Sequence, residues 1–130
     1  MNLEHAQTAM KIILHAGDAR EKTMDALKAL DTFDIENAKE LLKQANEAIV
    51  QAHQVQTDAL QAESRGEELE YSILFSHAQD TCMCASSELN VAMHLVDLFE
   101  VIDKRFKKIR KINNYLFGRN IFLPNLEDRR

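Results

Sequence analysis

The sequence predicts an all-α protein, and three observations support this prediction. Only 3 Gly and 1 Pro occur among 130 residues, and Ala, Leu, Glu, Lys and Gln, which lose little rotamer freedom in a helix, are frequent. Apolar residues recur at steps of three and four along most of the chain, as on one face of a helix. A chain of this length, 45% of it hydrophobic, can bury the core of one domain but is too short to divide comfortably. We therefore expect one helical domain over residues 1–103, followed by a basic C-terminal extension over residues 104–130.

The first helix is expected from Leu3 to about Leu30, where apolar residues keep the three-to-four spacing. Gly17 lies inside this helix and costs roughly 1 kcal/mol relative to Ala. This cost suggests that another backbone passes close to Gly17, although a tolerated surface glycine is the simpler alternative.

The second helix is expected to begin at Asp34, whose carboxylate can accept hydrogen bonds from free N–H groups of the first turn. Its apolar residues run from Ile35 to Ala59. It ends in a polar cluster in which Gly66 fits a left-handed C-terminal cap.

The third helix is expected from about Glu70 to at least Asp103, and it carries two apolar stripes. The first stripe suffices to pack on the other two helices, and it comprises Leu74, Ala78, Cys82, Ala85, Leu89, Ala92, Val96 and Phe99. The second stripe follows the spacing of a coiled coil, and it comprises Ile73, Asp80, Cys84, Ser87, Val91, His94, Leu98 and Val101. Short connections between these helices predict an up-down-up three-helix bundle, and the second stripe predicts that the bundles associate with one another.

Charge is distributed unevenly along the chain. Residues 1–103 hold 19 acidic and 7 basic side chains, whereas residues 104–130 hold 2 acidic and 9 basic ones. The body therefore repels nucleic acid, and we expect no nucleic-acid partner. No segment approaches the ~20 apolar residues of a membrane span, and the N-terminus lacks the pattern of a signal peptide, so we expect a cytoplasmic protein.

The two cysteines, Cys82 and Cys84, lie two residues apart on the expected third helix. Their side chains then point about 200° apart, at ~100° per residue. We expect two free thiols that form neither a disulfide nor a shared metal site.

The segment Ser76-His77-Ala78-Gln79-Asp80 is the most informative in the chain. His77 and Asp80 are three residues apart and therefore share one side of a helix. A neutral imidazole has a free nitrogen lone pair, so it can accept a phosphoryl group and pass it on. Taken alone, however, one His and one Asp on a helix are more often ordinary surface or core residues.

The surrounding sequence resembles the IIA components of lactose/cellobiose-type sugar phosphotransferase systems from about Met10 to Phe99. The resemblance lies in Ala16-Gly17-Asp18-Ala19-Arg20, in Ala52-His53 followed by Gln56-Thr57, and above all in the H-A-Q-D segment that begins at His77.

This resemblance implies a homotrimer of three-helix bundles with the third helix along the axis. It implies that His77 accepts phosphate from the phosphocarrier HPr and delivers it to a IIB cysteine. It also implies that Asp80 meets its symmetry mates around one metal ion on the axis. Mg²⁺ suits such a site, because carboxylates that converge without a cation raise one another's pKa.

The sequence departs from the family where H-A-Q-D is usually followed by a second histidine, because Thr81 stands there. A hydroxyl can donate a hydrogen bond to a phosphate but cannot carry a positive charge. We expect surface or structural roles for the other histidines, which lack a ligand at metal spacing, namely His5, His15, His53 and His94.

Two interpretations of the basic extension remain open at this stage. The run from Lys104 to Lys111, with the apolar residues after it, can dock on an anionic membrane surface. Alternatively, its cations complement the dipole at the end of the third helix, and the following segment folds back on the acidic body.

Two other functions also remain open. A histidine phosphotransfer domain of two-component signalling is likewise helical with one active His, but it usually has a Lys and a Gly shortly after that residue. Neither follows His77 in the next turns. The other alternative is a non-catalytic helical oligomer derived from the family.

Overall fold

A computed structural model describes residues 3–67 and 72–118 of the protein. Three long helices account for most of these residues: α1 (Leu3–Ala29), α2 (Ile35–Ser64) and α3 (Ile73–Phe117). A single 3₁₀ turn, η1 (Leu30–Thr32), joins α1 to the start of α2. No strand occurs within the described ranges, so the expected all-α class is confirmed.

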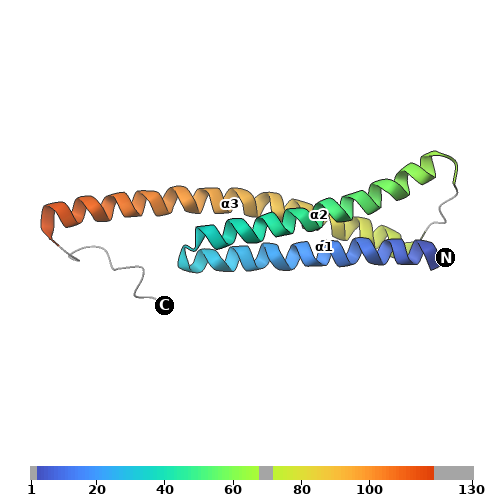
Figure 1. Ribbon diagram of the computed structural model, residues 1–130, viewed down its shortest axis with the longest axis horizontal. Coiled ribbons are helices and arrows are strands. Elements are labelled where there is room, and N and C mark those ends of the chain that lie inside the picture. The colour runs from blue at the N-terminus through green and yellow to red at the C-terminus, as the bar shows by residue number, and fades with distance from the viewer. Residues whose placement is uncertain (1–2, 68–71, 119–130) are drawn as a thin grey trace.

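The chain runs along α1, returns along α2, and runs along α3 in the direction of α1 (Figure 1). All three helices contact one another. α3 is the longest, and its C-terminal part extends past the end of the bundle that α1 and α2 form with it (Figure 1).

The core consists of narrow rows of small residues, one row on each helix. On α3 the buried positions are 78, 82, 85, 89, 92 and 96, which alternate steps of four and three residues as in a coiled coil. The row on α1 has the same alternation over Ala9, Ile12, Ala16, Ala19, Thr23 and Ala26. Most of these residues are alanines, so the helices can approach closely. The first predicted stripe of the third helix is the face that packs against the other two helices.

Local hydrogen bonds fix where the helices begin and end. The Asp34 carboxylate accepts a hydrogen bond from the Asn37 N–H at 3.3 Å, as predicted for the start of α2. Gly66 follows the end of α2 with a φ of 86°, and the N–H of Glu67 reaches back to the Ala62 carbonyl at 3.2 Å. This pattern is a Schellman cap, so the prediction for Gly66 is confirmed.

Helix α3 begins slightly later than the sequence predicts. Its N-cap is Ser72, whose hydroxyl accepts a hydrogen bond from the Phe75 N–H at 2.9 Å. Glu70, the predicted start, lies outside the described residues.

The close approach predicted for Gly17 is wrong. Gly17 is exposed, and a Cβ atom built there would meet no atom within 4 Å. The simpler alternative, a tolerated surface glycine, describes this chain.

The end of the bundle is marked by two contacts of α3. The ring of Phe33, which follows η1, packs on the ring of Phe99 with centroids 5.6 Å apart. Lys39 of α2 forms an ion pair with Glu100 of α3, which also pairs with Lys104 one turn later. Hydrogen bonds from Lys39 and Lys104 lower the pKa of Glu100.

Helix α3 continues through residues 103 and 104 without a break and ends at Phe117. Its last turn contains no basic residue. The cations of Lys104–Lys111 therefore do not lie at the helix C-terminus, and the interpretation that they complement the dipole there is wrong. The segment expected to fold back on the body lies outside the described residues. None of the helices in the described ranges has a stretch long and apolar enough to span a membrane.

Leu89 gives a direct test of the packing of α3. Its side chain is buried among the helices, so Leu89→Ala should lower the free energy of unfolding by about 2–4 kcal/mol through lost contacts and a residual cavity. Leu14→Ala, at an exposed position on α1, should change it by less than about 0.5 kcal/mol. Denaturant unfolding at one fixed protein concentration measures both, and equal losses would contradict the arrangement.

Candidate functional site

His77 and Asp80 lie near the beginning of α3, on the side that faces away from α1 and α2. Both residues are exposed, whereas Ala78 and Cys82 beside them are buried against the other helices. This arrangement follows from the heptad packing of α3. The buried row faces the other two helices, and the residues on the other side of α3 point outward. The structure thus brings the two predicted site residues onto one open surface.

The backbone around His77 is held by local hydrogen bonds. The Thr81 hydroxyl donates to the His77 carbonyl at 2.8 Å, a bond typical of Thr within a helix. This donor, which the sequence offered as a contact for phosphate, is therefore engaged by the helix itself. The imidazole of His77 has no hydrogen-bond or ion-pair partner among residues 3–67 and 72–118.

Further along α3, an ion pair fixes α1 to α3. Arg20 donates two hydrogen bonds to the Glu88 carboxylate, from Nε at 2.9 Å and from Nη2 at 2.8 Å. This fork-to-fork geometry is the strong form of an Arg–carboxylate pair. The hydrogen bond and the negative charge of Glu88 raise the pKa of Arg20. Sequence reasoning missed this contact, because the two residues are 68 positions apart.

The two cysteines face opposite sides of α3, as predicted. Cys82 is buried and Cys84 is exposed, and both are free thiols. Burial raises the pKa of the Cys82 thiol, so it is not a ready nucleophile. Cys84 lies one turn after Asp80 on the exposed side.

A single chain supplies no complete metal site within its described residues. No group of three or more His, Cys, Asp or Glu side chains gathers there. Asp80 offers one exposed carboxylate, so the described part of a single chain would hold a metal ion there by one side chain alone. Oxygen ligands of this kind suit a hard cation such as Mg²⁺.

The four remaining histidines do not gather into a metal-binding cluster with His77 among the described residues. His5, His15 and His53 are half-buried on α1 and α2, and His94 is exposed on α3.

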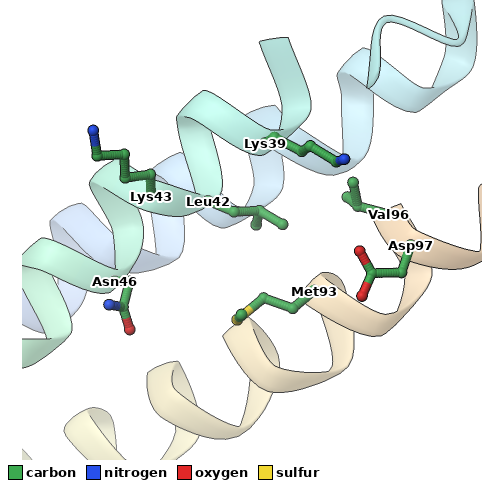
Figure 2. Close-up of a pocket in the computed structure, with 7 residues that line it drawn as sticks. All are labelled: Lys39, Leu42, Lys43, Asn46, Met93, Val96 and Asp97. Carbon is green, nitrogen blue, oxygen red and sulfur yellow. The ribbon is translucent and has the colours of Figure 1, made fainter. Parts of the chain in front are cut away.

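A groove of about 330 Å³ lies between the first half of α2 and α3 (Figure 2). Lys39, Leu42, Lys43 and Asn46 line it from α2, and Met93, Val96 and Asp97 line it from α3. Met93 lies 16 residues after His77, or about 24 Å along the helix at ~1.5 Å per residue. The groove is therefore separate from the exposed histidine.

This geometry suits a residue that reacts with a partner protein rather than with a small molecule in a cleft. An exposed, unpartnered imidazole can accept a phosphoryl group only if the partner supplies the positioning and the charge stabilisation.

Comparison with known proteins tests this interpretation. Residues 7–100 match the model of the family described as the lactose/cellobiose-specific IIA subunit of the phosphotransferase system. The chain belongs to this family.

Individual members of the family agree. The lactose-specific EIIA component of Staphylococcus epidermidis is 37% identical over 101 residues, which cover 77% of this chain and 97% of that protein. The lichenan-specific enzyme IIA component of Bacillus subtilis is 37% identical over 105 residues, which cover 81% and 96%.

The fold agrees as well. The crystal structure of the cellobiose-specific enzyme IIA of Bacillus anthracis superposes with a TM-score of 0.76 at 36% identity, over 80% of this chain and 95% of that one. His77 and Asp80 both lie within the stretch that matches the IIA family, whereas the end of α3 beyond residue 100 lies outside it.

Proposed function

We propose that this IIA protein carries a phosphoryl group on His77, accepting it from HPr and delivering it to a IIB cysteine. The relay acts in the cytoplasm during uptake of a lactose/cellobiose-type sugar. The observation that carries the proposal is the exposed, unpartnered His77 imidazole on α3, inside the region matched to the family. The sugar itself remains open, because the named relatives differ in their sugars and a phosphocarrier contacts proteins.

Each transfer exchanges one bond to phosphorus for another. A ring nitrogen of His77 donates its lone pair to phosphorus while the bond between phosphorus and the donor atom of HPr breaks, and the released pair returns to HPr. In the second step the IIB thiolate forms a bond to phosphorus while the N–P bond breaks, and that electron pair returns to the imidazole. A neutral imidazole is the reactive form in the first step.

We further propose that the protein is a homotrimer assembled along the exposed side of α3. Support comes from the second predicted stripe, in which Val91 is 57% and Leu98 is 53% exposed in the single chain. An apolar row of this extent on a long helix favours association with like helices.

Asp80 lies on the same stripe, so a threefold axis along α3 would bring three carboxylates together. We propose that they hold one Mg²⁺, whose charge allows the three groups to stay ionised. The ion would serve the assembly by neutralising charge.

The family match supports this relay over the alternative of a histidine phosphotransfer domain of two-component signalling. A non-catalytic oligomer is the remaining alternative. Incubation with phosphoenolpyruvate, its kinase and HPr, compared with incubation with a response-regulator phosphate donor, distinguishes the three. Phosphate from the first mixture alone supports the proposal, and phosphate from neither supports the non-catalytic alternative.

The first prediction concerns the acceptor residue. Wild type should gain about one acid-labile phosphate per chain from phospho-HPr, and His77→Ala should gain none, because it lacks the accepting nitrogen. His53→Ala should behave as wild type. Phosphate on His77→Ala would show that another residue is the acceptor.

The second prediction concerns assembly. Light scattering at micromolar concentration should give about 45 kDa, three times the 14.9 kDa chain. Val91→Asp should reduce this mass, because it places a charge in the proposed interface. Val50→Asp should not, although Val50 is equally exposed at 58%, because it lies on α2. A wild-type mass near 15 kDa rules out the trimer.

The third prediction concerns the metal ion. An ion at ~100 times its dissociation constant stabilises the assembly by roughly 2.7 kcal/mol, so Mg²⁺ should raise the melting temperature and a chelator should lower it. Asp80→Ala should not respond, whereas Asp97→Ala, an exposed carboxylate elsewhere on α3, should respond as wild type does. Equal responses from Asp80→Ala and wild type would show that Asp80 is not a metal ligand.

A further inference from the structure

The part of α3 beyond the bundle presents an apolar row that the rest of the described chain, residues 3–67 and 72–103, leaves exposed. This overhang, residues Lys104–Phe117, is about four turns or about 20 Å long at 1.5 Å per residue. α1 and α2 end before it begins (Figure 1), since Phe33 and Lys39 contact α3 at Phe99 and Glu100. A helix of this length is marginal in water on its own. A partner that packs on the exposed row would stabilise it.

The row shares Val91 and Leu98 with the second stripe of the bundle and takes Leu95 and Ile102 in place of His94 and Val101. From residue 91 to residue 116 the steps alternate four and three, and the positions are occupied by Val91, Leu95, Leu98, Ile102, Arg105, Ile109, Ile112 and Leu116. We name this row the α3 seam. Ile109, Ile112 and Leu116 are 50–60% exposed, much as Val91 and Leu98 are. An alternation of this kind over eight positions is the pattern of helices that pair with like helices.

The side of α3 that packs inside the bundle changes character at the same point. Seven and fourteen residues after the buried Val96 stand Asp103 and Arg110, and Asn113 follows in the same row, with Phe106 and Phe117 as the apolar exceptions. In the overhang the inward row is therefore half polar, whereas the outward row is apolar at every position except Arg105. A partner that covers the seam therefore approaches from a different side of α3 than α1 and α2 do.

Charge placement also favours a helical partner over a solvated end. Lys104, Lys107, Arg110 and Lys111 fall on the far side of the helix from the seam, and Lys104 and Lys107 pair with Glu100 and Asp103 one turn earlier. Cations on the side away from the seam remain hydrated and screened when the seams of different chains pack together. Arg105 is the only charged residue on the seam.

We propose that the overhangs of three copies pack seam to seam as a parallel coiled coil that prolongs the trimer past the bundles. The proposal rests on the trimer of the proposed function, since parallel α3 helices around one axis necessarily emerge side by side. Isoleucine at both kinds of seam position, as at Ile109 and Ile112, favours three strands over two. The overhang is thus an assembly element outside the family-matched region, which ends at residue 100.

Cysteine cross-linking of the full chain in a Cys84→Ser background tests the proposal. Ile112→Cys, on the seam, should form interchain disulfides under mild oxidation at least about tenfold faster than Asn114→Cys, which lies on the outer side. Equal rates in a protein of about 45 kDa would overturn the coiled coil while leaving the trimer intact. A mass near 15 kDa would overturn both.

Two further measurements separate a coiled coil from a solvated helix end and from a membrane-binding helix. Arg105→Leu should raise the melting temperature, because it completes the seam, whereas Lys111→Leu should not; equal effects would contradict the seam. Vesicles of phosphatidylcholine with phosphatidylglycerol should leave Ile112→Cys cross-linking unchanged. If they abolish it, the apolar row lies on a membrane surface, and the proposal is wrong.

Discussion

Alanine-lined contact between the helices sets the geometry of this protein. Ala16, Ala45 and Ala85 are fully buried, and such small side chains let helices approach closely along rows that repeat every 3.5 residues. Since α3 keeps this repeat from residue 78 to residue 96, it presents one constant side to α1 and α2 and another to the surroundings. The exposure of the histidine and of the seam both follow from that constant orientation.

Two ion pairs then hold α3 against the other helices, at two positions along its length. Arg20 and Glu88 join α1 to α3 within the half that carries the histidine, and Lys39 with Glu100 joins α2 to α3 where the bundle ends. The groups are partly exposed, so each pair adds more to the definition of helix position than to stability. Between these two contacts α3 is packed on one side, and beyond the second it extends past α1 and α2 (Figure 1).

Much of the fold can be predicted from the sequence, because periodicity and caps are local. The two stripes of α3, the N-cap at Asp34 and the C-cap at Gly66 are all predicted. Gly17 misleads because a glycine inside a helix has the same local signal whether or not a neighbour approaches. The reach of α3 to Phe117 is not fixed by the sequence, because basic residues suit both a helix end and an amphipathic continuation. His77 and Asp80 stand out through family resemblance, since their spacing alone is common in helices.

The threonine after Asp80 affects how the charge close to His77 depends on pH. Thr81 holds its hydroxyl on the His77 carbonyl, and a hydroxyl does not gain or lose a proton anywhere near neutrality. A histidine there, as the family usually has, would change its charge between about pH 5 and 8. In this chain, the position one turn after His77 therefore keeps the same charge when the pH around the protein drifts.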